Sequence, residues 1–173
     1  GVPVLVLPRN AERGREPIRA LTHHVPGGKF GNCGGFRQYT YVAQDPKTEL
    51  LLGPAYAIPQ VLEEAGLVLD DIDVIELHEA FAGQVLAVLE ALRSDTFAEE
   101  HLNRSDAVGE VNMDRLNTRG GSISLGHPFG ATGTRLVISA VNRLHDEDGR
   151  WALVSACAAG GLGHAMLIER MPE

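Results

Sequence analysis

The amino-acid sequence predicts a domain of the α/β class with a mixed sheet. Short apolar and β-branched segments alternate with longer segments whose apolar residues recur at helical spacing. Glycine-rich turns separate several of these segments. The last two apolar segments are joined by a connection short enough for an antiparallel pair. These observations together indicate strands and helices packed in layers.

The elements are expected in a regular order. Residues 36–43 are aromatic and β-branched enough for a strand. A helix is expected to follow, with Ala57, Val61 and Ala65 at a spacing of four, Pro59 in its first turn and Gly66 at its end. A short buried strand then covers residues 72–77.

The next helix is predicted from an apolar stripe formed by Phe81, Val85, Leu86, Leu89 and Leu92. Residues 78–80 therefore form a strand-to-helix junction, where side chains can point into a crevice at the carboxyl end of the strand. Residues 94–118 are polar and weakly patterned.

The carboxy-terminal part begins with a glycine-rich turn at residues 126–133. A helix follows it, with an inner face made of Leu136, Val137, Ala140, Val141 and Leu144. Two apolar strands, at residues 151–156 and 164–169, complete the domain. We expect them to form an antiparallel pair.

Residues 1–35 contain four prolines and a glycine cluster, which predicts an irregular arm in front of the domain at 36–173. The chain starts at Gly1 without a methionine, which suggests a fragment or a processed chain.

Composition excludes several classes of protein. The 173 residues are 44% hydrophobic and 22% charged, which fits one soluble globular domain. The formal net charge of −8 carries no basic run, so nucleic acid is not expected as a partner. No apolar stretch approaches the roughly 20 residues that span a bilayer, and the first residues do not resemble a signal peptide.

The two cysteines predict neither a disulfide framework nor a zinc site. Cys33 and Cys157 form no CxxC motif, so a reducing compartment is expected. A metal site that uses His23, His24 or Cys33 would lack helix-face or knuckle spacing, and no metal is predicted.

Three loops, at residues 78–81, 126–128 and 157–161, combine a polar or reactive residue with small neighbours. Taken alone, His78 could cap a helix, His127 could be a turn residue, and Cys157 could be a small buried hydrophobe. Together they predict a catalytic site, because a histidine near a cysteine promotes the reactive thiolate.

These loops carry a family resemblance. Residues 117–133 (NTRGGSISLGHPFGATG) resemble the thiolase signature N-x-x-G-G-x-x-x-x-G-H-P-x-G-A-x-G. Residues 157–163 resemble the second cysteine loop of the family, and residues 78–82 its N-E-A-F-A loop. His78, Ala159 and segment 45–54 are most similar to the branch formed by the β subunit of the trifunctional fatty-acid oxidation complex.

The resemblance covers about residues 36–173 and implies one half of the thiolase fold. This half is a layered α/β domain, a mixed five-stranded sheet with helices on both faces. The other half would be a similar domain that precedes it in the full chain.

The resemblance also assigns catalytic roles. His127 would be the base that activates a nucleophilic cysteine. Cys157 would exchange a proton with the substrate α-carbon and with the CoA thiol, a task suited to a reference pKa of about 8.5. His78, where most members have asparagine, would hold a water or donate directly in one oxyanion site, with His127 beside it.

Further residues would bind the substrate or shape the site. The backbone at Ala159 and Gly160 would form the second oxyanion site. Phe81 would line the acyl or pantetheine path, and Glu79 would hold the loops in place. Cys33 does not match the pattern of the family's nucleophile, which lies in the preceding domain, so this chain is expected to be catalytically incomplete alone.

The implied function is that of an acyltransferase: CoA-dependent thiolytic cleavage of 3-ketoacyl-CoA to acetyl-CoA and a shortened acyl-CoA in fatty-acid β-oxidation. Coenzyme A would be a substrate, with no cofactor. The implied partners are the amino-terminal half that carries the nucleophile, a homodimer or higher oligomer, and a hydratase/dehydrogenase subunit. The bacterial cytoplasm, or the mitochondrion in a eukaryote, is the expected compartment.

Two alternatives remain. One is a non-catalytic thiolase-like binding or assembly module, against which the presence of both His127 and Cys157 argues. The other is a condensing enzyme of the same fold that forms the carbon–carbon bond. Because such enzymes typically use two histidines with the nucleophile, Cys157 favours a thiolase.

Overall fold

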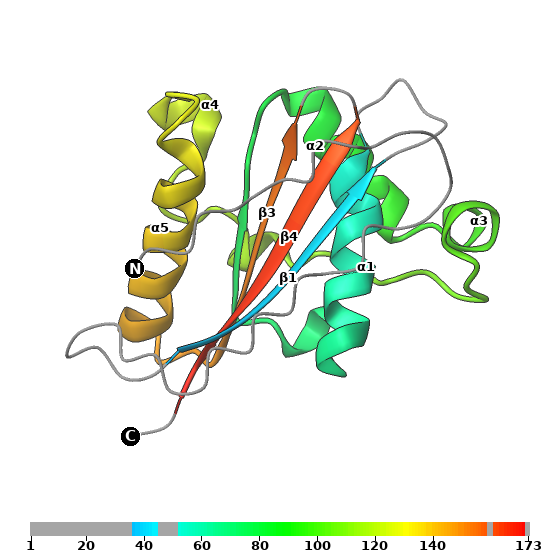
Figure 1. Ribbon diagram of the computed structural model, residues 1–173, viewed down its shortest axis with the longest axis horizontal. Helices are drawn as coiled ribbons and strands as arrows, with labels where there is room; N and C mark the ends of the chain where they lie inside the picture. The colour runs from blue at the N-terminus through cyan, green and yellow to red at the C-terminus, as the bar shows by residue number, and fades with distance from the viewer. Residues whose placement is uncertain (1–35, 45–51, 159–160, 172–173) are drawn as a thin grey trace, which may run out of the picture.

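The computed structural model describes residues 36–44, 52–158 and 161–171, and these residues form a layered α/β domain around one mixed sheet (Figure 1). The sheet has the order β1-β4-β3-β2. Strand β2 pairs in parallel with β3, whereas β3–β4 and β4–β1 are antiparallel. The strands are β1 (Phe36–Gln44), β2 (Val74–Leu77), β3 (Trp151–Ala158) and β4 (Leu162–Arg170).

The structure confirms the predicted α/β class, the mixed sheet and the final antiparallel pair. The described residues contain four strands, one fewer than the five that the resemblance implies. The predicted arm at residues 1–35 and the cysteine within it, Cys33, lie outside the described residues.

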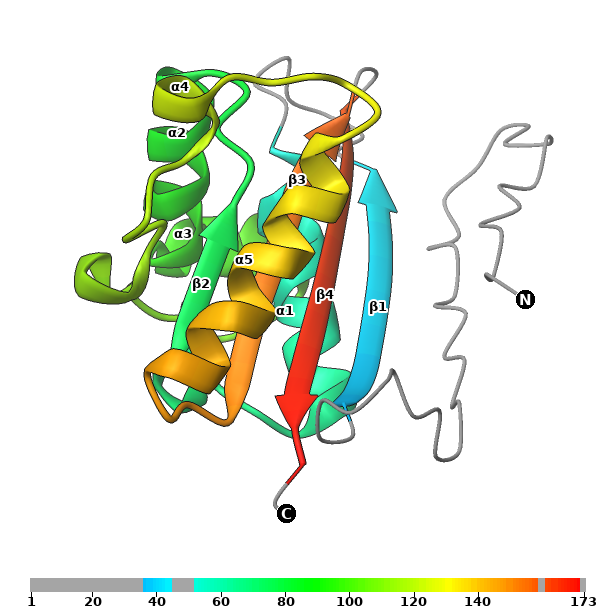
Figure 2. The same ribbon diagram turned by 90° about the vertical axis from the view of Figure 1, so that its left-hand side faces the viewer.

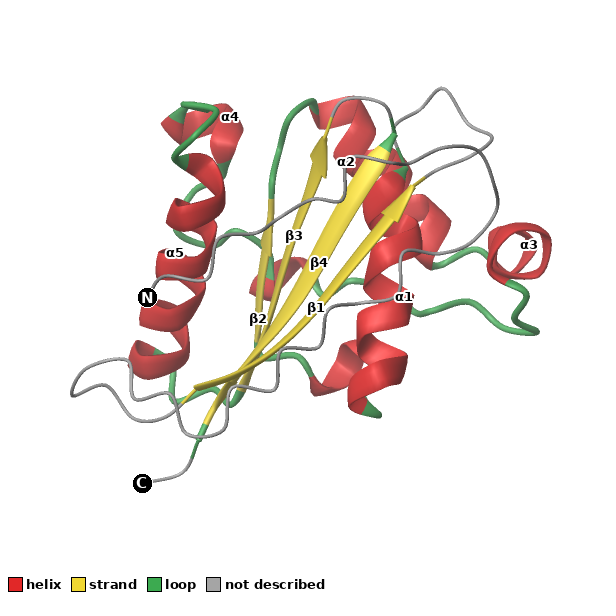
Figure 3. Cartoon of the chain, viewed as in Figure 1, coloured by secondary structure: helices red, strands yellow, loops and turns green. Residues whose placement is uncertain are grey.

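Helices cover both faces of the sheet. Helices α1 (Gly53–Ala65) and α2 (Ala82–Leu92) lie on one face, and α5 (Thr132–Asp146) lies on the other (Figures 2 and 3). Each face has its own apolar cluster, one under α1 and α2 and one under α5. Because both faces are covered, all four residues of β2 are buried. No helix of the described ranges has the length and apolar character to cross a membrane.

Helix α1 departs from the sequence prediction at its start. It begins at Gly53 with Pro54 in the first turn, so the prediction that Pro59 occupies that turn is wrong. Pro59 lies inside the helix, where its ring nitrogen cannot donate to the carbonyl of Ala55. The predicted end is correct, since Gly66 adopts a left-handed conformation with φ of 67°.

The predicted inner faces are confirmed for α5 and corrected for α2. Leu136, Ala140 and Leu144 of α5 are fully buried. Of the stripe predicted for α2, Phe81 is 66% exposed and Leu86 is 64% exposed. Leu92 of the stripe is fully buried, and Val85 and Leu89 pack against the core while partly exposed. The helix also turns Gln84, Val88 and Ala91 inward, which the stripe did not include.

The polar segment after α2 contains more structure than its sequence pattern predicts. It forms two short helical turns, α3 (Asp95–Phe97) and the π-helical η2 (Ala98–Leu102). The rings of Phe97 and His101 pack on Tyr56 of α1, with centroid distances of 5.4 and 6.2 Å. Three aromatic rings therefore anchor a segment that lacks an apolar stripe. A third short turn, η3 (Met113–Arg115), follows.

Helix α1 meets the sheet through a contact between two glycines. Gly53 lies against the backbone of Gly163 in β4, and a Cβ atom added to either residue would overlap the backbone of the other. This close approach is available only to residues without a side chain.

The glycine contact predicts a large difference between two substitutions. Gly163→Ala should lower the free energy of unfolding by about 3 kcal/mol or more, because backbone cannot move aside as a side chain can. Gly83→Ala is the control, since an added Cβ there meets nothing within 4 Å. It should leave stability unchanged or raise it by up to about 1 kcal/mol. Urea unfolding measures the stability of both variants. Equal unfolding midpoints for Gly163→Ala and Gly83→Ala would show that the close approach of the two glycines does not limit stability.

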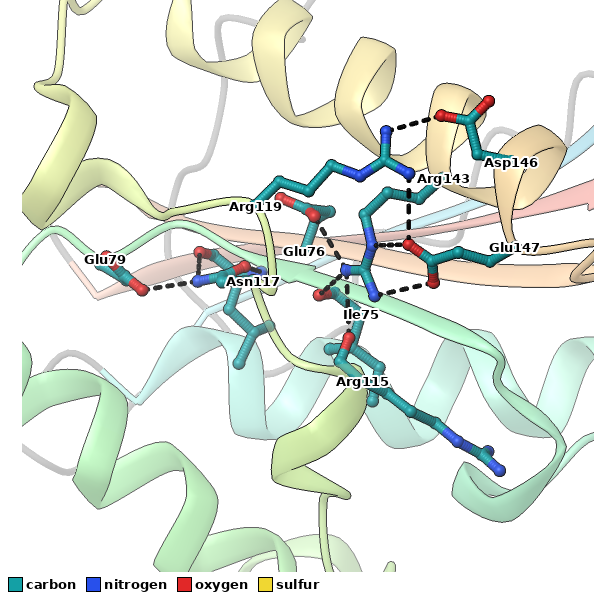
Figure 4. A network of polar contacts seen from close by, with 10 residues as sticks. Ile75, Glu76, Glu79, Arg115, Asn117, Arg119, Arg143, Asp146 and Glu147 are labelled. Atoms are coloured by element: carbon teal, nitrogen blue, oxygen red, sulfur yellow. Dashed lines mark hydrogen bonds and ion pairs between the residues drawn. The ribbon is translucent and has the colours of Figure 1, made fainter.

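A buried arginine ties α5 to the sheet (Figure 4). Arg143 is 1% exposed, and its Nη1 donates to Glu76 Oε1 of β2 at 3.0 Å and to the carbonyl of Arg115 at 3.1 Å. Its Nε donates to Glu147 Oε1 at 2.9 Å. The guanidinium thus compensates a carboxylate that is itself 1% exposed.

Removal of this arginine should be strongly destabilising. Arg143→Met leaves Glu76 as a buried carboxylate without its cation, which costs about 3–5 kcal/mol in comparable pairs. Arg93→Met, which breaks an exposed ion pair with Glu90, should give no measurable change. Thermal or urea unfolding provides the comparison, and an unaffected Arg143→Met protein would show that the ion pair is dispensable.

Candidate active site

The candidate site lies at the carboxyl ends of β2 and β3. Because these strands are parallel neighbours, their carboxyl ends share one edge of the sheet. His78 follows β2 directly, and its backbone N–H continues the ladder by donating to the carbonyl of Ser155 at 2.8 Å. Cys157 lies near the end of β3, paired with Gly163, so it belongs to the strand and not to the loop.

His127 reaches the same edge from the other face of the sheet. It lies in the loop between the short helix α4 (Ser122–Leu125) and α5. The rings of His78 and His127 pack against each other, with centroids 4.1 Å apart and planes tilted by 45°. The structure therefore brings two of the predicted site residues into contact across 49 residues of sequence.

His78 is the buried member of the pair. It is 6% exposed, and its Nδ1 lies 2.8 Å from Ser122 Oγ. Burial lowers the pKa of His78 below its usual value of about 6.5, and positive charge at His127 and Arg135 lowers it further. Glu79 acts in the opposite direction. His78 is therefore neutral at pH 7.

His127 is the exposed member, and Thr132 is its hydrogen-bond partner. Its Nδ1 lies 2.7 Å from Thr132 Oγ1, and this hydroxyl also lies 3.3 Å from the carbonyl of Pro128. When the hydroxyl donates its one hydrogen to Pro128, Thr132 Oγ1 accepts from an N–H at Nδ1 of His127. In that arrangement Nε2 of His127 keeps the lone pair that a general base requires. The ring of Phe129 covers this imidazole at 4.8 Å.

Cys157 is half-buried and carries a protonated thiol. Its Sγ donates to Gln84 Oε1 at 3.8 Å. Burial raises the pKa of this thiol above its ordinary value. Gln84 and His78 both line a small pocket with Pro54 and Ser155. Gln84 therefore contacts the thiol of Cys157 and also lines the pocket that His78 lines.

A carboxylate and an amide hold the catalytic loops together (Figure 4). Asn117 donates to Glu79 Oε1 at 2.7 Å and also bonds both backbone groups of Leu77, at 2.9 Å each. The other oxygen, Glu79 Oε2, accepts from the backbone N–H of Ile123 at 3.0 Å. A Cβ atom at Gly121 would overlap this carboxylate. Asn117 of the signature therefore holds the Glu79 carboxylate, and Gly121 leaves room for it. Glu79 in turn connects the loops, which is the structural role predicted for it.

The structure does not add the other predicted residues to this group. Ala159 and Gly160, the predicted second oxyanion site, lie outside the described residues. Phe81 precedes α2 with its ring exposed to solvent. Within residues 36–44, 52–158 and 161–171, no cluster of histidine, cysteine and acidic residues has the geometry to hold a metal ion.

Three further residues contact the predicted ones, and a fourth contacts one of these three. Ser122 and Thr132 bond the two imidazoles, Gln84 bonds the thiol, and Arg135 donates to Ser122 Oγ at 2.9 Å. The sequence gave no signal for these four residues, since Ser122 and Thr132 occupy variable positions of the signature and the other two lie outside it.

Comparison with known proteins identifies the family. Residues 32–170 match the model of the thiolase C-terminal domain, and the chain belongs to the thiolase family. It is 58% identical over 137 residues to the human protein named trifunctional enzyme subunit beta, mitochondrial. It is 60% identical over 133 residues to a probable 3-ketoacyl-CoA thiolase of Caenorhabditis elegans. It is 49% identical over 136 residues to a 3-ketoacyl-CoA thiolase of Pseudoalteromonas translucida.

These matches cover most of this chain but a minor part of each relative. They span 77% to 79% of the chain and 29% to 31% of the relatives. The crystal structure of human mitochondrial 3-ketoacyl-CoA thiolase is 34% identical and superposes with a TM-score of 0.64, over 76% of this chain and 29% of that one. The family resemblance found in the sequence is confirmed.

The raised pKa of Cys157 predicts slow alkylation near neutral pH. The thiolate fraction at a given pH falls when the pKa rises, so iodoacetamide should react with Cys157 more slowly at pH 8 than with the same cysteine in denaturant. The pH midpoint of the reaction should lie above the ordinary value of about 8.5. The rate is measured by mass spectrometry in a Cys33→Ser background. A midpoint below about 8 would mean that the thiol is activated and not protonated at rest.

Proposed function

We propose that this chain supplies the carboxy-terminal part of a 3-ketoacyl-CoA thiolase active site, which cleaves a 3-ketoacyl-CoA into acetyl-CoA and a shortened acyl-CoA. The observation that carries this proposal is the packed pair of His78 and His127 at the strand edge that also bears Cys157. The names of the relatives, 3-ketoacyl-CoA thiolase and trifunctional enzyme subunit beta, support it.

In the first half of the proposed reaction, His127 acts as the base. Its Nε2 takes the proton of a cysteine thiol supplied by the amino-terminal half of the enzyme. The thiolate attacks the 3-keto carbonyl, and the bond between C2 and C3 breaks. Cys157 donates its proton to C2 of the departing enolate, which leaves as acetyl-CoA. The half-buried, protonated thiol of Cys157 suits it to be this acid.

In the second half, Cys157 acts as the base. Its thiolate takes the proton of an incoming CoA thiol, and the CoA sulfur attacks the acyl-enzyme thioester. The tetrahedral intermediate collapses to the shortened acyl-CoA and returns the nucleophilic cysteine, whose proton comes back from His127. Each proton returns to its starting group, so the reaction needs no cofactor, and coenzyme A is a substrate.

The oxyanions of both steps need donors placed where charge develops. We assign His78, with His127 beside it, to one oxyanion site, and the backbone at Ala159 and Gly160 to the other. Phe81 is assigned to the acyl or pantetheine path, where its exposed ring is free to contact substrate. A solved human mitochondrial thiolase is in complex with CoA, which supports CoA as a ligand here.

The proposed partners follow from the relatives. The chain spans about three tenths of their length, so an amino-terminal half with the nucleophilic cysteine completes the site. A homodimer or higher oligomer and a hydratase/dehydrogenase subunit are proposed from the family resemblance, and the name of the relative, a subunit of a trifunctional enzyme, supports a further subunit. The relatives include mitochondrial and bacterial proteins, so the proposed compartment is the mitochondrion in a eukaryote and the cytoplasm in a bacterium.

A complementation assay tests this function. The chain is combined with the amino-terminal half of human trifunctional enzyme subunit beta, and cleavage of acetoacetyl-CoA and of a long-chain 3-ketoacyl-CoA is followed by loss of enolate absorbance. The combination should be active and the chain alone inactive. His127→Ala should lower kcat by about 10²–10⁴, the contribution typical of a general base. His145→Ala, at an exposed histidine outside the site, should have no effect.

Three outcomes would contradict the proposal. Turnover by the chain alone that disappears in Cys33→Ala would place the nucleophile within this chain. A normal acylation burst in His127→Ala would remove its role as base. Binding of acyl-CoA without turnover in the complemented enzyme would favour the non-catalytic module.

A further inference from the structure

A short chain of polar groups leads from the surface of α5 to the buried histidine. Arg135 Nη2 donates to Ser122 Oγ at 2.9 Å, and Ser122 Oγ lies 2.8 Å from His78 Nδ1. Ser122 is 4% exposed and His78 is 6% exposed, so water does not readily replace either contact. The direction of each hydrogen bond along this chain decides which nitrogen of His78 carries its proton.

The arginine fixes the direction of the first bond. A guanidinium only donates, so Ser122 Oγ accepts from Arg135 and uses one of its two lone pairs. Its hydroxyl hydrogen must then find an acceptor. Within the described part of the chain, His78 Nδ1 is the only other polar atom that the structure bonds to this hydroxyl.

The second bond then has one arrangement that satisfies both groups. If Ser122 donates to an unprotonated Nδ1, the hydroxyl hydrogen is bonded and the imidazole proton stays on Nε2. If Nδ1 carried the proton instead, the buried hydroxyl hydrogen would be left without an acceptor, which is costly. Nε2 has no hydrogen-bond partner among the described residues, so its N–H is available to a ligand.

We propose that Ser122 and Arg135 are positioning residues that hold His78 in the tautomer with its proton on Nε2, and so present an N–H donor to the thioester oxygen. This inference rests on the proposed thiolase function and assigns its oxyanion donor to one atom. Neither residue would touch the substrate. Their action passes through His78.

The neighbouring histidine can take the opposite tautomer. When Thr132 donates its hydroxyl hydrogen to the Pro128 carbonyl, it accepts from His127 Nδ1. The two packed imidazoles then differ at Nε2, where His78 carries a hydrogen and His127 carries a lone pair. The reaction needs one donor for the oxyanion and one base for the thiol, which is this combination.

The charges around His78 agree with a neutral ring. His127 and Arg135 are the positive or potentially positive groups that act on it, and Glu79 is the negative one. Burial is the main cause that lowers the pKa of His78, and the charge of Arg135 adds to it, so the choice between two neutral tautomers applies at pH 7.

Nitrogen NMR reads the tautomer directly. The chain is labelled with ¹⁵N-histidine, combined with the unlabelled amino-terminal half used in the complementation assay, and compared with His78→Ala to assign the signals. The ¹⁵N shifts distinguish a protonated from an unprotonated ring nitrogen. At pH 7.5 we expect His78 to show a bare Nδ1 and a protonated Nε2. A protonated Nδ1 in the unmodified protein overturns the inference, whatever the activity.

Variants test whether Ser122 and Arg135 cause the tautomer. Ser122→Ala and Arg135→Met should each shift His78 toward a mixture of tautomers and lower kcat by roughly tenfold to a hundredfold, less than the loss expected for an oxyanion donor itself. Ser122→Thr keeps the hydroxyl and should keep the Nε2–H form. Arg93→Met, at an exposed arginine that pairs with Glu90, should change neither the tautomer nor kcat.

The experiments distinguish failure of the proposed thiolase function from failure of the proposed positioning role. If the complemented enzyme has no thiolase activity but His78 carries its proton on Nε2 in a Ser122-dependent manner, the proposed function fails and the tautomer assignment stands. If the enzyme is active and Ser122→Ala changes neither the tautomer nor kcat, the positioning role is wrong and the proposed function stands.

Discussion

The parallel pairing of β2 with β3 is the constraint on which the candidate site depends. The register places Leu77 opposite Ser155, so the residues that follow each strand emerge at one edge of the sheet. The backbone of His78 extends this ladder by one more bond, to Ser155. A shift of one residue would turn every side chain of β2 to the opposite face, and buried clusters on both faces oppose that shift.

Buried polar groups then fix the loops above this edge. Arg143 joins α5 to Glu76 within β2, and Asn117 joins the loop before α4 to Glu79 just beyond β2. Both carboxylates accept from donors that lie later in the chain, Arg143 for Glu76 and Asn117 for Glu79. The contacts brace the strand that carries His78 from two directions. The imidazole of His78 packs against His127 through contacts within this chain alone.

Much of this arrangement was accessible from the sequence. Helical and strand periodicity gave the order of elements. The signature at residues 117–133 and the loops at 78–82 and 157–163 indicated the family, whose resemblance implies roles for His127, Cys157 and His78. Local patterns failed where long-range packing decides the outcome. Pro59 lies inside α1 because the helix starts earlier, at the glycine contact with β4. Phe81 and Leu86 are apolar at helical spacing yet exposed, since α2 packs through its Gln84 and Val88 face.

The residues proposed to set the tautomer of His78 could not be found from periodicity. Ser122 and Arg135 are separated from His78 by 44 and 57 residues, and a single serine or arginine has no distinctive spacing. Gln84 is a polar residue in an apolar helix, which reads as a solvent-facing position until the fold places it on Cys157. These contacts emerge only from tertiary structure.

The central claim is that His127 and Cys157 are two acid–base groups that face one substrate, with coenzyme A on the side of Cys157. A crystal structure of the complemented enzyme with bound CoA tests it most directly. We expect the CoA sulfur to lie within hydrogen-bond reach of Cys157 Sγ, about 3–4 Å, and His127 Nε2 to point to the nucleophilic cysteine. A CoA sulfur bound beyond reach of Cys157, with His127 turned away from that cysteine, would contradict it.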